Sequence, residues 1–260
     1  MTEQPTSPPA EPLTSTEPFV SNRPRATVTV ILLLTLAALG LVSILSSLLQ
    51  LSLASEAIAG EVISDERAAA NDLRQAAVAI LLLIVNIATV VAFCFWIHRA
   101  YRNLRALGNP PNSLDFSPGW AVGWFFIPIA NIIMPYRVVR ELWAKSDPSV
   151  RTKDDFLFAA EASTALIPVW WVMWLVSNFV ERLVNRFYGD AETAEGLAWA
   201  TKADIVSTVL WIVAALLAAL VVRRIDGRQE ERSRHVVYQP ETPPPPPIFT
   251  PPQPAPPPVG

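Results

Sequence analysis

The sequence contains little of the side-chain chemistry on which most enzymes depend. It has one cysteine, Cys94, and two histidines, His98 and His235. A single cysteine excludes an intrachain disulfide and a cysteine-based metal site, and Cys94 lies in an apolar run where a small hydrophobic residue is expected. The motifs of a phosphate-binding loop, a zinc protease and a serine hydrolase are also missing. We therefore predict no enzymatic activity, no cofactor and no bound metal.

Charge is also scarce. Only 17% of the residues are charged, and the 23 acidic and 20 basic side chains leave a net charge of -3, which excludes a nucleic-acid partner because phosphate binding needs a basic excess. Four long apolar stretches without charge are the candidates for spanning helices: residues 26–55, 75–97, 162–180 and 205–222. Each is close to or above the roughly 20 residues needed to cross hydrocarbon. Because ionisable groups are absent from these stretches, a proton-coupled carrier is disfavoured. The sequence predicts an all-α membrane protein with four spanning helices, in a domain over residues 26–225.

The first of these stretches has a competing interpretation as a secretory signal peptide. Arg23 and Arg25 precede it, and residues 57–59 resemble a cleavage site. However, its 30 uncharged residues are about twice the length of a signal-peptide apolar region, which has roughly 7 to 15 residues. We therefore interpret residues 26–55 as an uncleaved membrane anchor.

Proline is concentrated at the two ends of the chain. Residues 1–25 contain six prolines, and the residues from Pro240 onward contain 12, five of them in succession at 243–247. Segments of this composition cannot bury enough apolar surface to offset the entropy of ordering. We predict disordered tails over 1–25 and 226–260. The proline run in the second tail favours the polyproline II conformation, which presents a stiff ligand surface.

Residues 117–135 raise a question of topology, because they are apolar but contain three prolines. Ser117 and Pro118 are typical of a helix start, and Pro128 predicts a kink near the middle. Basic residues help to distinguish a fifth span from a re-entrant or interfacial segment, since lysine and arginine collect in cytoplasmic loops. If the segment does not cross, one side holds 15 of the 20 basic residues, whereas a crossing segment divides them 12 to 8. We favour a re-entrant or interfacial segment, with both termini in the cytoplasm and an amphipathic helix at 135–146 along the inner surface.

Three stretches carry a resemblance to a known family. They read FWIHRAYRNLRALG at 95–108, SPGWAVGWFFIPIANIIMPYRVVRELW at 117–143 and WWVMWLVSN at 170–178. Together they resemble the bacterial integral membrane proteins grouped as domain of unknown function 4328, over residues 75–222. The resemblance implies a multi-span membrane fold and no particular activity.

Few polar side chains are candidates for a functional site. His98, Arg102 and Arg105 repeat at helical spacing with Arg99 beside them, and the three arginines could contact anionic lipid headgroups, although topological anchoring requires the same residues. Asn86 lies at the centre of the second span, where its amide needs a partner, and we predict that it joins helices rather than contacting a substrate. The other candidates for packing the bundle or lining a ligand site are Gly119, Trp120, Gly123, Trp124, Pro128, Asn131, Trp170, Trp174 and Asn178.

These features predict a non-enzymatic protein of the cell membrane, with the lipid bilayer as its first partner. The proline-rich tail predicts a second partner, a soluble cytoplasmic protein, because polyproline segments suit aromatic grooves. The alternative is a carrier or channel for a small solute that uses the broken segment 117–135, since broken helices form the binding sites of many transporters. The sequence has no second broken segment in a repeated half, and we therefore favour the scaffold over the carrier.

Overall fold

The computed structural model describes residues 11–152, 165–189 and 193–240. This part of the chain is mainly helical, which confirms the predicted all-α class. Its body consists of four long helices: α1 (Arg23–Ile58), α2 (Asp65–Ala106), α6 (Leu166–Gly189) and α7 (Ala194–Ser233). The shorter elements are the strands β1 (Leu13–Ser15) and β2 (Val236–Tyr238), the helices α3 (Pro118–Gly123) and α4 (Met134–Lys145), and the 3-10 turns η1 (Pro111–Ser113) and η2 (Ala130–Ile132).

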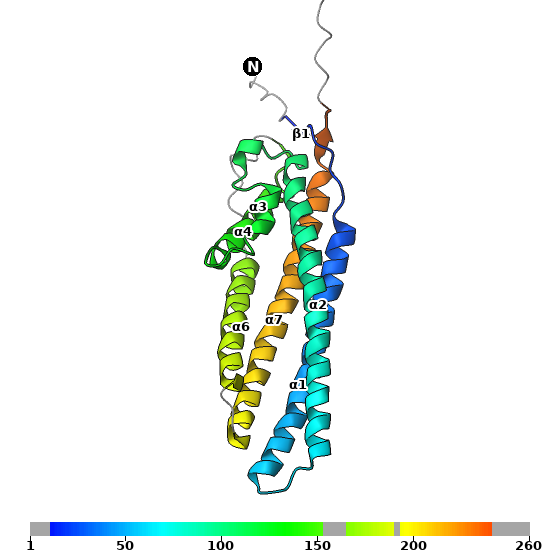
Figure 1. The fold of residues 1–260 in the computed structure, drawn as a ribbon. Helices are drawn as coiled ribbons and strands as arrows, with labels where there is room; N and C mark the ends of the chain where they lie inside the picture. The colour runs from blue at the N-terminus through cyan, green and yellow to red at the C-terminus, as the bar shows by residue number, and fades with distance from the viewer. Residues whose placement is uncertain (1–10, 153–164, 190–192, 241–260) are drawn as a thin grey trace, which may run out of the picture.

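The long helices lie side by side and alternate in direction (Figure 1). α1 packs along both α2 and α7, and α7 packs along α6. The short elements collect at one end of the bundle, which we call the cap and define as residues 11–22, 98–150 and 223–240. The chain therefore leaves the cap in α1 and α6 and returns to it in α2 and α7.

Side-chain hydrogen bonds fix the starts of α2 and α7, the two helices that run toward the cap. Ser64 has an extended backbone, and its hydroxyl accepts a hydrogen bond from the Arg67 N–H while two acidic residues occupy the first turn of α2. Thr193 does the same for the Gly196 N–H at the start of α7. Both arrangements satisfy amide groups that a helix start otherwise leaves unpaired, and the acidic residues complement the helix dipole.

Three helices of the described part of the chain, α1, α2 and α7, are long and apolar enough to cross a membrane, and this indicates a membrane protein. They contain the stretches 26–55, 75–97 and 205–222 that the sequence marks as spans. The fourth predicted span, 162–180, overlaps α6, and its first three residues lie outside the described residues. Large apolar side chains remain exposed along α2, among them Ile84 and Phe95, and an exposed apolar surface of this kind suits contact with lipid.

Residues 117–135 form two short helical pieces joined by a reversal, rather than the predicted kinked helix. Ser117 Oγ accepts a hydrogen bond from the Trp120 N–H, and α3 ends after six residues. The chain reverses after Pro128, at Ile129, whose φ of 68° lies in the left-handed region that β-branched residues rarely adopt. η2 then leads into α4, and all of these elements lie at the cap (Figure 1).

α4 coincides closely with the amphipathic helix predicted at 135–146. Its apolar face is covered by protein, because Val138, Val139 and Leu142 are each 0% exposed. Arg137 and Arg140 lie on the exposed face. The prediction that this helix lies with its apolar face on the membrane surface is therefore wrong, since α2, α6 and α7 pack against α4.

The ordered part of the chain extends further at both ends than the sequence predicts. α7 continues beyond the predicted tail boundary, and β2 pairs in parallel with β1. Leu13 is 1% exposed, so the strand near the amino terminus belongs to the core of the cap. Residues 11–25 and 226–240 are thus part of the fold, which corrects the predicted tails. The rest of those tails, 1–10 and 241–260, lies outside the described residues.

Candidate functional site: a cationic groove and an aromatic cavity in the cap and bundle

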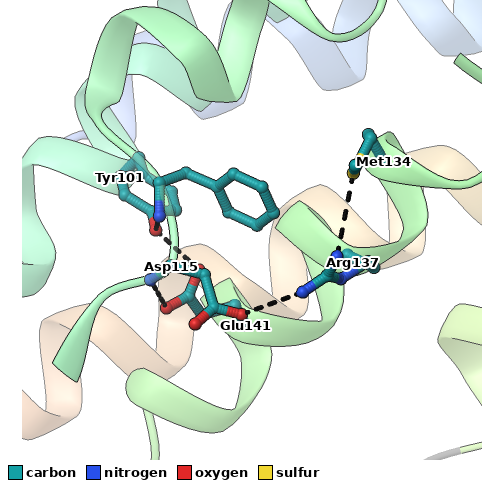
Figure 2. Close-up of polar contacts among 6 residues, drawn as sticks. Tyr101, Asp115, Met134, Arg137 and Glu141 are labelled. Carbon is teal, nitrogen blue, oxygen red and sulfur yellow. Dashed lines mark hydrogen bonds and ion pairs between the residues drawn. The ribbon is translucent and has the colours of Figure 1, made fainter. Parts of the chain in front are cut away.

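The broken segment is held at its start by a buried tyrosine (Figure 2). The Tyr101 hydroxyl on α2 donates a hydrogen bond of 2.6 Å to Glu141 Oε2 on α4, and it accepts one of 2.9 Å from the Phe116 N–H. The other carboxylate oxygen of Glu141 accepts a 2.8 Å hydrogen bond from the Asp115 N–H. Asp115 also pairs with Arg137 at 3.4 Å. Side chains of α2 and α4 therefore hold residues 115–116 in place immediately before α3.

The electrostatics of this cluster favour a structural role. Burial raises the pKa of Glu141, and the hydrogen bonds from Tyr101 and from the Asp115 N–H offset only part of this effect. Burial and the adjacent Glu141 carboxylate also raise the pKa of Tyr101, so the phenol keeps its proton at neutral pH. Tyr101 is 1% exposed and cannot meet a soluble substrate. The pair thus acts as a clamp between α2 and α4.

A cationic groove runs across the cap end of α2, with a volume of about 580 Å³. Its lining comes from three places: residues 17–20 before α1, the polar face of α2, and the start of α3. Asn103 Nδ2 on α2 donates to the Val20 carbonyl at 2.9 Å and so holds the amino-terminal segment against the helix. The lining residues are Glu17, Pro18, Val20, His98, Arg99, Arg102, Asn103, Arg105, Ala106, Pro118 and Gly119.

The charges in the groove are unevenly paired. Arg105 makes an ion pair with Glu17 at 3.6 Å. Arg99 and Arg102 have no carboxylate partner in residues 11–152, 165–189 and 193–240, and Arg99 Nε is buried there without a hydrogen bond. Burial, followed by repulsion from Arg102 and Arg25, lowers the pKa of Arg99, which lies outside the predicted span. The groove therefore has an excess of positive charge that an anion would neutralise.

An aromatic cavity of about 270 Å³ lies deeper, between the long helices. Trp170, Trp171 and Trp174 of α6 face it, together with Phe125 and Phe126 from the broken segment. The rings of Trp171 and Trp174 stack with centroids 4.7 Å apart. Trp171 Nε1 donates to the Ile132 carbonyl at 3.0 Å, which ties the reversal of the broken segment to α6. The remaining lining residues are Leu33, Leu36, Asn86, Thr89, Val90, Phe93, Cys94, Trp211, Ala214, Ala215 and Ala218.

The structure divides the predicted site residues between these places. Arg99, Arg102, Arg105 and Gly119 line the groove, whereas Asn86, Trp170 and Trp174 line the cavity. The others line neither. Trp120 and Trp124 pack on each other with ring centroids 5.0 Å apart, and Gly123 lies beneath the Trp120 ring. Asn178 Nδ2 donates to the Trp174 carbonyl of its own helix, while Pro128 and Asn131 flank the reversal at Ile129.

The region that holds these sites matches a known family. Residues 59–227 match the family described as Domain of unknown function (DUF4328). The chain belongs to the DUF4328 family. No curated protein and no solved structure matches it. The matched region of this DUF4328 protein contains α2, the whole broken segment and most of α7, while α1 and both strands lie outside it.

Among the described residues of this DUF4328 protein, a buried arginine with several hydrogen bonds lies in the predicted tail. Arg232 at the end of α7 is fully buried, and its guanidinium donates to the Leu107 carbonyl at 3.1 Å, the Lys145 carbonyl at 2.9 Å and Asn109 Oδ1 at 3.3 Å. One turn earlier, Gln229 donates to the Ala100 carbonyl at 2.9 Å. α7 therefore joins the ends of α2 and α4.

The hydrogen bonds of Gln229 and Arg232 to α2 and α4, which we call the latch, were not predicted from the sequence, although a weak signal for them exists. Ile225, Gln229 and Arg232 recur at helical spacing after the last predicted span, and all three are buried. Polar residues at such positions usually indicate a solvated face. Tyr101 and Glu141 were missed for a different reason, because they are 40 residues apart and only the fold of the cap brings them together.

Proposed function

We propose that this DUF4328 protein is a non-enzymatic integral membrane protein that acts as a scaffold at the inner face of the cell membrane. In this role its proline-rich carboxy-terminal tail recruits a soluble cytoplasmic partner. The single observation that best supports the proposal is the parallel pairing of β1 with β2, in which Leu13 lies opposite Val236 and Ser15 opposite Tyr238. Because of this pairing, residues 11 and 240, where the described chain begins and ends, lie at the same end of the bundle (Figure 1).

The proposed topology has four spanning helices, a re-entrant or interfacial segment at 117–135, and both termini in the cytoplasm. The cap would then face the cytoplasm, in keeping with the excess of arginine and lysine in its segments. The ends of α2 and α7 that lie opposite the cap would face outward. α6 would be the fourth span, because it runs antiparallel to α7 along the same bundle (Figure 1).

The absence of an enzymatic role is also part of the proposal. It is supported by how the buried polar groups of the cap are used. Gln229 and Arg232 donate to backbone carbonyls of α2, its C-cap and α4, and Tyr101 and Glu141 bond to each other and to two backbone amides. Each of these groups is hydrogen-bonded within the protein, whereas a catalytic group needs access to substrate.

Photo-crosslinking in cells tests recruitment directly. A photoreactive amino acid replaces Tyr238, which is 51% exposed at the last described strand. We expect a crosslinked adduct with a soluble protein that disappears when the five prolines at 243–247 are replaced by serine, and that remains when residues 1–10 are deleted. An adduct that persists after the serine replacement would refute recruitment through the proline run. Membrane insertion of all variants is checked by alkaline extraction.

Cysteine labelling tests the topology. In a Cys94→Ser background, single cysteines are placed at Val62, which is 94% exposed at the end opposite the cap, and at Ser149 and Arg234 in the cap. An impermeant maleimide applied to intact cells should label position 62 alone, and it should label all three positions after lysis. Labelling of position 149 or 234 in intact cells contradicts the proposed orientation.

The second candidate function is a carrier or channel for a small solute. The aromatic cavity favours it, because Phe125 and Phe126 of the broken segment line the same space as Asn86 and the tryptophans of α6. Purified protein in liposomes should then transport solute at a rate that falls when Trp174 is replaced by alanine. A flux that is equal for the wild type and the Trp174→Ala variant removes this candidate.

A further inference from the structure

We propose that the cationic groove binds the phosphate of one anionic phospholipid, whose acyl chains lie along the outward face of α2. The proposal requires that α2 spans a membrane with its cap end at the surface. It does not depend on recruitment by the tail, and it gives the protein a specific lipid ligand in addition to its general contact with the bilayer.

The spacing of residues on α2 places an apolar stripe directly below the groove. The stripe continues at intervals of three and four residues into the groove-lining residues, so that all of them share one helical face. Its apolar members are strongly exposed: Ile84 at 59%, Ile87 at 56%, Val91 at 49% and Phe95 at 63%. The next positions on the same face are His98, Arg99 and Arg102.

The charge of the groove determines the sign of the ligand. Arg102 and Arg25 both lie close enough to Arg99 to repel its charge. Glu17, the acidic residue in the lining, already pairs with Arg105. Arg99 and Arg102 therefore remain available for an anion, and the planar guanidinium group matches the oxygen pairs of a phosphate.

The stripe identifies the source of the phosphate. A free phosphate would use only the groove, whereas a phospholipid also uses the exposed apolar side chains one to four turns below it. α2 packs along α1 but not along α6, so its outward face is open for acyl chains over this length. At a membrane surface, each basic residue adds about 1 kcal/mol to the binding of anionic lipid. The groove thus selects an anionic over a zwitterionic headgroup.

Binding of phosphatidylglycerol to the purified full-length protein in detergent, followed by native mass spectrometry, tests the proposal. Phosphatidylcholine and inorganic phosphate serve as the comparison ligands. We expect one phosphatidylglycerol to bind preferentially to the wild type, with affinity about thirtyfold lower in the Arg99→Gln/Arg102→Gln variant, equivalent to about 1 kcal/mol for each charge. The matched control is Arg223→Gln/Arg224→Gln. It removes two exposed charges at the cap end of α7 and should leave binding nearly unchanged.

Three results would overturn the proposal. Equal losses of phosphatidylglycerol affinity in the groove variant and the control variant would mean general attraction to anionic lipid. Phosphatidylcholine binding as tight as that of phosphatidylglycerol would mean no selection by charge. Inorganic phosphate binding as tight as that of phosphatidylglycerol would mean no role for the stripe. An Arg99→Lys/Arg102→Lys variant guards against a folding defect, because it keeps both charges. We expect this variant to bind more tightly than the glutamine pair, and failure to do so also counts against the proposal.

Discussion

Replacing Arg232 tests the idea that α7 holds the cap together. Its guanidinium makes two short hydrogen bonds, of 2.9 Å to the Lys145 carbonyl and 3.1 Å to the Leu107 carbonyl, and a longer one of 3.3 Å to Asn109 Oδ1. The two carbonyls lie at the last residue of α4 and at the C-cap of α2, where a helix leaves its carbonyl groups unpaired. A cation at this position also complements both helix dipoles.

The magnitude follows from the two short bonds. A hydrogen bond to a charged group contributes about 1.5 to 3 kcal/mol, so we expect Arg232→Ala to lower the free energy of unfolding by at least about 3 kcal/mol. For a protein of this size, such a loss lowers the midpoint of thermal unfolding by about 6 to 12 °C. Burial lowers the pKa of Arg232 to about 10, so the guanidinium stays charged at neutral pH and the cost of burying it is already included in the wild-type stability.

The assay is thermal unfolding in detergent micelles, followed by circular dichroism. Arg234→Ala is the matched control, because Arg234 is exposed two residues further along and should change the midpoint little. Arg232→Met keeps much of the side-chain volume without the donors, and it should behave like the alanine variant if hydrogen bonding is the cause. A midpoint for Arg232→Ala within about 2 °C of the wild type would refute the latch.

Three further predictions concern the clamp, the helix contacts and pH. Tyr101→Phe removes the hydroxyl that bonds Glu141 and the Phe116 N–H, so hydrogen exchange of residues 109–116 should accelerate by roughly tenfold while the long helices keep their protection. Gly40→Leu should destabilise the bundle by about 1 to 3 kcal/mol in the same thermal assay, because a Cβ at Gly40 would already lie 2.7 Å from Ile212 Cγ1. The control is Gly227→Ala, which should not destabilise the protein because a Cβ at Gly227 would have no atom within 4 Å. Although burial alone would raise the pKa of Asp147, the hydrogen bonds from Ser149 and the charge of Arg228 lower it overall. Its contribution to stability is therefore present above the unfolded pKa of about 3.9 and is lost as the pH falls below it, so an Asp147→Asn variant should lose less stability than the wild type between about pH 4 and pH 2.

Glycine illustrates how far sequence patterns reach. Gly119 and Gly123 have the spacing of a helix contact motif, yet a Cβ at Gly119 would meet no atom within 4 Å, and one at Gly123 would meet only the Trp120 ring of its own short helix. Gly40, in the middle of α1, is where two long helices approach closely. A spacing identifies glycines that could permit a close approach, but the partner helix decides which one does so.

The basic residues at the end of α2 were likewise predicted only in part from the sequence. The basic run at the end of α2 was predicted as a possible lipid contact from its helical spacing alone, and three of its arginines do line one groove. The spacing does not predict that Arg105 pairs with Glu17, whereas Arg99 and Arg102 form no ion pair with a described residue. The groove also needs the amino-terminal segment, which was predicted to be a disordered tail.

The sequence by itself determines that this is a helical protein with helices long and apolar enough to cross a membrane, because uncharged runs of this length have few other stable arrangements. It also determines membership of the DUF4328 family. The tertiary structure alone decides how the cap is built. Ile129 reverses the broken segment, Arg232 satisfies the ends of two helices, and β1 pairs with β2 more than 200 residues away along the chain. Apolar runs are recognised by local composition, whereas each of these contacts depends on a partner that is distant in sequence, and no local pattern specifies that partner.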